Sequence, residues 1–275
     1  MNAFGHLDAF LNQDAVTALP PTAESPHKRD LIAGLEKGLA VIEAFDQDRP
    51  RLTISEVAQR CSLTRAAARR YLITLEYLGY VSSDRRMYSL SPKVLRLGQS
   101  YMHSARLPRI VQPELHKLAY ALKEASSAGV LDGHDVICIA ATEAGRLVSS
   151  TLQPGTRVPA YCTANGRVLL SAKTPAEIDA WLAGQALEPR TPHTLTDRDT
   201  LRNEITRIRS RGYATVDQEF ELGLRTISVP LKNYRGEMLA AMNISVQAAR
   251  VSMDSLVNDC LPALLQAQAR LRGTL

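Results

Sequence analysis

The stretch from Thr53 to Tyr80 constrains the fold of this chain more than any other. It reads TISEVAQRCSLTRAAARRYLITLEYLGY and predicts two short helices joined by the tight turn Cys61-Ser62-Leu63. Thr53 with Glu56 three residues later is a capping box that begins the first helix, and Thr64 caps the second. Two short helices joined in this way are typical of a helix-turn-helix, whose second helix enters the DNA major groove.

The second of these helices predicts two faces of different chemistry. Its apolar side chains recur at three- and four-residue steps, a pattern that places them toward a core. These are Ala68, Leu72, Leu75 and Leu78. The first two turns carry arginines and small residues on the other side, where arginine pairs bidentately with guanine and alanine permits close approach. With the helix starts and the turn, the candidate DNA-binding residues here are Thr53, Ser62, Thr64, Arg65, Ala66, Arg69 and Arg70.

A basic hairpin follows this helix. Tyr80–Val81 and Met87–Leu90 alternate like two short strands around the turn Ser83-Asp84-Arg85-Arg86. Arg85 and Arg86 then reach phosphate or the minor groove, as a wing does. An earlier helix is predicted with an inner face of recurring apolar residues. That face comprises Leu31, Leu35, Leu39, Ile42 and Phe45. Residues 30–91 are therefore expected to form a winged helix-turn-helix domain, preceded by a flexible arm at residues 1–29.

Charge and composition narrow the class of protein. The 275 residues carry a net charge of +5, and residues 28–100 hold 13 Lys and Arg against eight Asp and Glu. That excess suits a phosphate-contacting surface. No apolar run approaches the roughly 20 residues of a membrane helix, and no secretory signal is present, so we expect a cytoplasmic protein without membrane contact. The four scattered cysteines and six scattered histidines favour buried thiols over a disulfide framework, and predict no metal site or cofactor.

The second half of the chain predicts an α+β domain. A linker helix is expected at residues 92–108, ended by Pro108, and a helix from Ile110 opens a domain at residues 109–275. Strand patterns then alternate with helix patterns, which favours an antiparallel sheet flanked by helices. Strands are expected at 128–131, 136–142, 147–152, 213–216, 226–231 and 238–246, and helices at 163–171, 175–184, 197–211 and 253–271.

Three stretches together resemble the IclR-type bacterial transcriptional regulators over residues 30–272. They are GLEKGLAVIEAF with the helix-turn-helix segment, YCTANGRVLLS, and VDQEFELGLRTISVPLKNYRGEMLAAMNISV. The resemblance implies a homodimer or a dimer of dimers on a palindromic promoter site. It also implies a small carboxylate effector in a GAF-like second domain and no catalytic residue. The subgroup it resembles most controls aromatic-acid catabolism through protocatechuate and β-ketoadipate.

The resemblance also places an effector pocket. The implied residues are Tyr161, Thr163, Ala164, Asn165, Leu224, Arg225, Thr226, Asn243 and Ser245. Helix-start amides near Thr163 favour an anion, a guanidinium such as Arg225 forks onto a carboxylate, and Tyr161 faces an aromatic ring. Some members have cysteine where this chain has Thr226, and others have serine where it has Asn243. The effectors of those members are therefore not transferred.

Different roles are also open to some of these residues. Arg225 has a structural alternative, an ion pair with Glu219 or Glu221. An enzyme on a GAF-like fold would use Cys162 as nucleophile with His134 or His193 as base, although no ordered triad or phosphate loop supports it. A protein-interaction adaptor would use the winged fold without DNA, and the basic wing argues against it.

Overall fold

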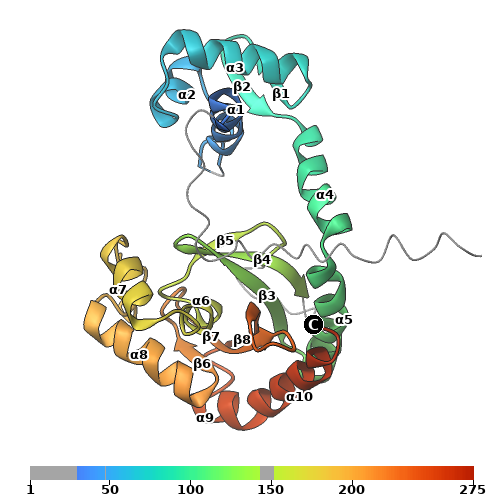
Figure 1. The fold of residues 1–275 in the computed structure, drawn as a ribbon, viewed down its shortest axis with the longest axis vertical. Coiled ribbons are helices and arrows are strands. Elements are labelled where there is room, and N and C mark those ends of the chain that lie inside the picture. Colours follow the sequence, from blue (N-terminus) through green and yellow to red (C-terminus); the bar gives the residue numbers. More distant parts are fainter. Residues whose placement is uncertain (1–29, 47, 143–151) are drawn as a thin grey trace, which may run out of the picture. The chain divides into compact units, whose positions relative to one another are not determined.

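The computed structural model describes residues 30–46, 48–142 and 152–275. The chain divides into two compact units between Ser104 and Ala105 (Figure 1). The predicted arm at residues 1–29 and the strand predicted at 147–152, except for Leu152, lie outside the described residues. Within those residues, every helix is too short or too polar to cross a bilayer.

The first unit is a winged helix-turn-helix. Its helices are α1 (Ala33–Glu43), α2 (Ile54–Arg60) and α3 (Arg65–Tyr77), and the strands β1 (Val81–Asp84) and β2 (Met87–Leu90) pair antiparallel. Both predicted caps are confirmed. The Thr53 hydroxyl accepts from the Glu56 N–H while the Glu56 carboxylate accepts from the Thr53 N–H, and the Thr64 hydroxyl accepts from the Ala67 N–H at 3.2 Å. Each such cap stabilises its helix by about 1 kcal/mol.

The core of this unit differs from the prediction at α1. The recurring leucines of that helix are exposed, Leu35 by 61%, whereas Val41 is fully buried. In α3, Ala68, Leu72 and Leu75 are buried as predicted, but Leu78 is 46% exposed. Ile42 and Phe45 are partly buried and pack against this core as predicted. The apolar stripe of α1 is wider than the area that α2, α3 and the hairpin cover in so small a unit, so its leucine side stays exposed.

The helix that follows the hairpin breaks earlier than predicted. A short 3-10 helix (Pro92–Val94) leads into α4 (Leu95–Ser104), and α5 (Arg106–Leu122) begins after Ala105. Pro108 is the third residue of α5 and does not end a helix. The prediction of a break at Pro108 is therefore wrong, because the first turn of a helix has no acceptor for an N–H that proline lacks.

Over its described residues, the second unit is built on a six-stranded antiparallel sheet in the order β5-β4-β3-β8-β7-β6. Its strands are β3 (Ala125–Asp132), β4 (Asp135–Thr142), β5 (Arg157–Pro159), β6 (Ala214–Asp217), β7 (Leu224–Lys232) and β8 (Met238–Gln247). The predicted antiparallel sheet is confirmed. Four of the five strand pairs join strands that follow one another in the chain, and β3 and β8 meet in the middle although they are more than a hundred residues apart.

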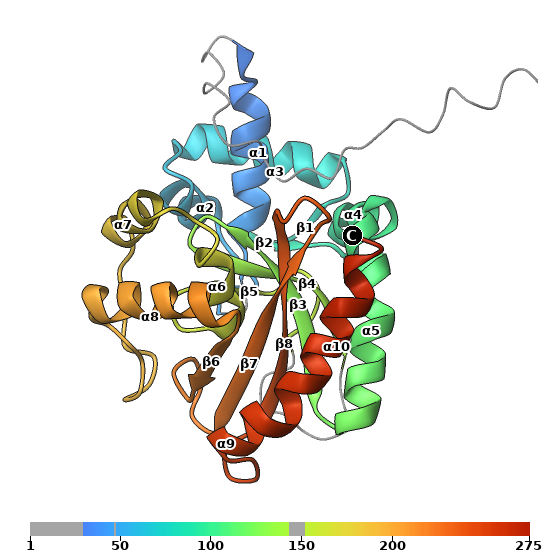
Figure 2. The ribbon, with the colours of Figure 1, turned by 60° about the horizontal axis from the view of Figure 1, so that its bottom comes forward.

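Helices cover both faces of this sheet (Figure 2). One face packs against α5 and α10 (Leu261–Arg272) through a core of aliphatic residues from β3, β4, β7 and β8. The other face carries α6 (Ala164–Leu170), α7 (Pro175–Ala183) and α8 (Arg198–Arg211), with a second aliphatic core between them. Both cores draw residues from the sheet, because successive side chains along β7 and β8 point to opposite faces.

The closing helix is interrupted. The sequence predicts one helix over 253–271, but the chain forms a short turn α9 (Met253–Ser255), a π-helical turn (Leu256–Cys260) and then α10. Pro262 lies in the first turn of α10. Because proline cannot donate to the carbonyl four residues earlier, the hydrogen-bond ladder widens by one residue immediately before it.

The start of α6 lies unusually close to the preceding chain. A Cβ placed on Gly166 would lie 2.1 Å from the Ala160 carbonyl oxygen and 2.3 Å from its Cα. Those are backbone atoms, which do not move aside as a flexible side chain does. Only glycine lets α6 approach Ala160 this closely.

We expect Gly166→Ala to destabilise the protein by about 2–4 kcal/mol, because the added methyl group collides with the Ala160 backbone and forces α6 away from it. Chemical denaturation of the purified variant measures this. Gly184→Ala is the matched control, since its added Cβ meets only the His134 ring at 3.5 Å and the Trp181 carbonyl at 3.8 Å. Equal stability of the two variants would show that position 166 does not require glycine.

Candidate functional site

The DNA-facing candidates of α3 lie on its solvent side. Arg65, Ala66, Arg69 and Arg70 are all exposed, while Ala68 is buried on the opposite side. Arg65 and Arg69 are four residues apart, so they lie one above the other on one face of the helix. The Thr64 cap fixes where this face begins.

The turn and the helix start that precede α3 hold the remaining candidates. Ser62 is exposed and adopts a left-handed backbone conformation with φ of 52°. The Leu63 N–H returns to the Ala58 carbonyl at 2.8 Å, which fixes the angle between α2 and α3. The Thr53 hydroxyl accepts from the Glu56 N–H, so in this structure Thr53 acts as the N-cap of α2.

The wing is a tight hairpin with two arginines at its tip. Arg85 and Arg86 connect β1 to β2 and are exposed, and Arg85 has a φ of 60°. Asp84, which precedes them, pairs with Arg51 at 2.8 Å. The nearest acid is thus neutralised by another residue, and the positive charge of the tip is left uncompensated.

Two other acidic residues of this unit, Asp46 and Glu76, are also engaged by neighbouring residues. Asp46 accepts a hydrogen bond from the Arg49 backbone and pairs with Arg60, and these two contacts hold the pKa of its carboxyl below the ordinary value. Glu76 accepts from the Ser83 hydroxyl at 2.5 Å. Among the described residues, the five arginines of α3 and the wing make no ion pair with any of these acids. The surface they form is electropositive and suits a phosphate backbone.

In the second unit, a buried polar cluster joins α6 to the middle of the sheet. The Asn243 side-chain oxygen accepts from the Ser127 hydroxyl at 2.5 Å and from the Asn165 amide at 3.2 Å. Ser228 donates to the Asn165 oxygen at 2.6 Å, and the Asn243 amide donates to Ser245 at 3.0 Å. Strand register explains the grouping, since Asn243 lies between Ser127 of β3 and Ser228 of β7. The cluster contains no charged group.

Other predicted effector residues surround this cluster. Thr226 lies opposite Ser245 in register and on the same face of the sheet. Thr163 caps α6, accepting from the Gly166 N–H at 3.3 Å and donating to the Pro159 carbonyl at 2.9 Å. Ala164 and Leu224 are buried, and Tyr161 is buried with its hydroxyl donating to the Glu188 carbonyl at 2.6 Å.

Arg225 lies on the other face of the sheet. It alternates with Thr226 along β7 and shares its parity with Ile227 and Val229, which pack in the α5–α10 core. Its guanidinium forks onto Asp217 at 2.8 and 3.3 Å and donates to the Ala248 and Val251 carbonyls. Arg225 is therefore not brought together with Asn243 and Ser245. Its ion-pair partner is Asp217 and not the Glu219 or Glu221 considered from sequence.

The sequence interpretation missed three members of this region. Ser228 could have been found, because it shares a strand face with Thr226. Ser127 lies one residue before the strand predicted from Ala128. Arg167 is fully buried and forks onto Glu219, with N–O distances of 2.7 and 2.5 Å. Its position as the sole charged residue in the mostly apolar helix ANGRVLL could have identified it from the sequence.

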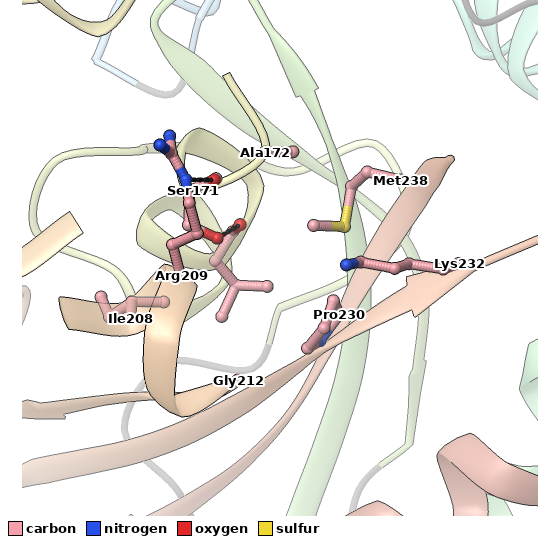
Figure 3. A pocket seen from close by; sticks show the side chains of 9 residues that line it. Ser171, Ala172, Ile208, Arg209, Gly212, Pro230, Lys232 and Met238 are labelled. Atoms are coloured by element: carbon pink, nitrogen blue, oxygen red, sulfur yellow. Dashed lines mark hydrogen bonds between the residues drawn. The ribbon is translucent and has the colours of Figure 1, made fainter. Parts of the chain in front are cut away.

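A separate cavity of about 60 Å³ lies at the opposite end of α6 (Figure 3). It lies between the last turns of α6 and α8 and the β7–β8 hairpin, and none of the nine predicted effector residues lines it. Arg209 closes one wall by donating to the Ser171 carbonyl at 2.8 Å and to the Lys173 carbonyl. Lys232 and Met238 face it from the hairpin. Arg209 thus satisfies carbonyls at and just beyond the C-terminal end of α6, where helical donors are lacking.

Cys162, the nucleophile of the enzyme alternative, is a buried thiol. Burial raises its pKa to about 11, and its sulfur contacts the Pro159 carbonyl at 3.9 Å. A nucleophilic cysteine needs a lowered pKa. Among the described residues, no group of three or more His, Cys, Asp or Glu is placed to hold a metal ion.

An arginine-bearing recognition helix and wing, with a second unit that encloses a polar cluster, defines a DNA-binding regulator that responds to a small molecule. Two family models match the chain: the IclR helix-turn-helix domain over residues 34–85 and the bacterial transcriptional regulator IclR C-terminal domain over residues 99–271. The chain belongs to the IclR family of bacterial transcriptional regulators. This membership favours the regulator over the enzyme alternative, since the family and its relatives are regulators.

Relatives span nearly the whole chain. A Pca regulon regulatory protein of Pseudomonas putida is 42% identical over 257 residues, covering 90% of this chain and 88% of that protein. A crystal structure of a transcriptional regulator from Rhodococcus sp. RHA1 is 41% identical with a TM-score of 0.76, covering 89% and 98% of the two chains. The inducer-binding domain of a PobR double mutant from Acinetobacter, solved with 3-hydroxybenzoic acid, is 31% identical with a TM-score of 0.59, covering 62% and 100%.

We expect Cys162 to resist alkylation in the folded protein at neutral pH, because a buried thiol with a raised pKa holds almost no thiolate. Mass spectrometry after brief exposure to iodoacetamide measures it. Cys61, which is only half-buried, is the internal control and should react first, and all four cysteines should react in denaturant. Rapid labelling of Cys162 in the native state would revive the enzyme alternative.

Proposed function

We propose that the protein regulates transcription by binding a palindromic promoter site as a homodimer or a dimer of dimers, and that a small aromatic carboxylate changes this binding. The observation that carries the proposal is the buried polar cluster around Asn243, which lies between α6 and the sheet in the unit that does not contact DNA. A protein acting on bacterial promoter DNA works in the cytoplasm.

The DNA contacts are proposed for α3 and the wing. Arg65 and Arg69 read base edges in the major groove, where each bidentate pair with guanine discriminates by about 1–3 kcal/mol. Thr53, Ser62, Thr64, Ala66 and Arg70 line the same approach, and Arg85 and Arg86 contact phosphate or the minor groove. The absence of carboxylate partners for these arginines among the described residues supports this assignment, since no desolvated ion pair has to be broken on binding.

The effector contacts are proposed for the face of the sheet that carries α6. Each asparagine amide in the cluster donates one hydrogen to a neighbour, and the second is left for a ligand oxygen. Thr163, Thr226 and Ser245 add hydroxyls, while Tyr161, Ala164 and Leu224 supply apolar walls. Arg225 is excluded from this site, because its donors are occupied on the opposite face.

An aromatic acid suits this chemistry. Neutral donors bind a carboxylate or a phenolic oxygen, and the buried apolar surroundings favour a ring. The similarity to a Pca regulon regulator and to an inducer-binding domain solved with 3-hydroxybenzoic acid supports the same class of ligand. Candidates are 4-hydroxybenzoate and protocatechuate.

We expect Arg69→Ala to weaken specific DNA binding by about 1–3 kcal/mol, because one bidentate base contact is lost. Fluorescence anisotropy on DNA that the wild-type protein selects from a random library measures this. Arg272→Ala, an exposed arginine at the end of α10, is the control and should bind normally. Unchanged affinity in both Arg69→Ala and Arg65→Ala would rule out the assignment of the recognition helix.

We expect Asn243→Ala to weaken effector binding by about 1.5–3 kcal/mol while leaving DNA binding unchanged, since a hydrogen bond to a charged group is lost. Calorimetry with 4-hydroxybenzoate and protocatechuate measures the affinity, and thermal unfolding confirms the fold. Asn203→Ala on the exposed side of α8 is the control. If neither acid binds the wild-type protein or raises its melting temperature, this class of effector is excluded.

A further inference from the structure

Arg167 is the only charged residue of α6 and is 1% exposed. Removing a guanidinium from water costs several kcal/mol, which its partners repay only in good geometry. A methionine or leucine would fill the same space without that cost. The role of this arginine therefore lies in what it joins.

Its donors are directed to two separate segments. The Arg167 Nε donates to the Tyr161 carbonyl at 2.8 Å, in the turn that leads to the proposed effector residues Thr163 and Asn165. Its terminal nitrogens fork onto the two carboxylate oxygens of Glu219, beyond the end of β6. This bidentate arrangement fixes the direction of the pair as well as its distance.

Glu219 in turn holds the segment 188–195. Its carboxylate accepts from the Leu195 N–H at 2.9 Å, and its carbonyl accepts from the Thr194 hydroxyl at 2.6 Å. The other end of the segment contacts Tyr161 itself, because the Tyr161 hydroxyl donates to the Glu188 carbonyl at 2.6 Å. Tyr161, Arg167, Glu219 and the segment 188–195 thus form a closed ring of contacts.

We propose that Arg167 is a positioning residue of the effector site, a role that rests on the function proposed above. It holds the turn 161–165 in the conformation that binds effector and couples occupancy of that turn to the segment 188–195. A ligand that orders Thr163 and Asn165 also orders the Tyr161 carbonyl. Arg167 and Glu219 carry that ordering to Leu195, and a buried bidentate pair transmits it because it tolerates little displacement.

The test compares two arginines of the second unit, Arg167 on α6 and Arg225 on β7. Arg225 also forks onto a carboxylate and donates to backbone carbonyls, but on the face away from α6. Arg167→Lys and Arg225→Lys each keep the charge and lose the fork. The full-length variants and the wild type are titrated with 4-hydroxybenzoate and protocatechuate by calorimetry. Amide hydrogen exchange of residues 188–195 is followed with and without the acid.

We expect Arg167→Lys to bind the acid about tenfold more weakly than the wild type and to lose the ligand-induced protection of 188–195. Arg225→Lys should retain both. Wild-type affinity and protection in Arg167→Lys would overturn the proposal, as would equal losses in the two variants, which would indicate a general effect on folding. If the wild type binds neither acid, the proposed effector class fails, and the positioning role fails with it.

Should Arg167→Lys fold poorly, Arg167→Met combined with Glu219→Leu replaces the pair by apolar side chains of similar size, a change that buried ion pairs often tolerate. A stable double variant with tenfold weaker binding supports the role, and one with wild-type affinity and protection overturns it.

Discussion

The close contact between α6 and the chain at Ala160 determines the geometry of the second unit. Gly166 lets the helix backbone approach where any side chain would collide. On one side of that glycine, Asn165 reaches Asn243 and Ser228 in the sheet. On the other side, Arg167 reaches back to the Tyr161 carbonyl and across to Glu219. Three successive residues thus have different roles. The contacts of Asn165 and Arg167 depend on the close approach that Gly166 permits.

The two faces of the sheet differ in chemistry, because successive side chains along a strand point to opposite faces. Along β7, Thr226 and Ser228 face α6, whereas Arg225 and Ile227 face α5 and α10. Adjacent residues therefore have opposite environments, and a one-residue change of register would exchange them. Arg167, which is fully buried, and Arg225, which is half-buried, follow the same division. Arg225 ties β7 to β6 and to the segment before α9 through Asp217 and two carbonyls, while Arg167 ties α6 to the segment 188–195.

The first unit is specified mostly by local interactions. Two hydroxyl caps and a short turn position α2 and α3, and a two-residue hairpin forms the wing. Asp84 pairs with Arg51 and Asp46 pairs with Arg60, and the arginines of α3 and the wing make no ion pair within the described residues. An exposed array of like charge destabilises a small domain slightly and favours association with a polyanion.

The sequence alone determined the features that rest on neighbours along the chain: the helix caps, the winged helix-turn-helix, the antiparallel sheet and the arginines of α3. These follow from periodicity and capping, which act within a few residues. Only the tertiary structure decided that the leucines of α1 are exposed, that Arg225 and Asn243 lie on different faces, and that Arg167 pairs with Glu219. The first depends on how much area a small core covers, and the second on strand register. The third joins residues 52 positions apart, a distance over which no local pattern carries information.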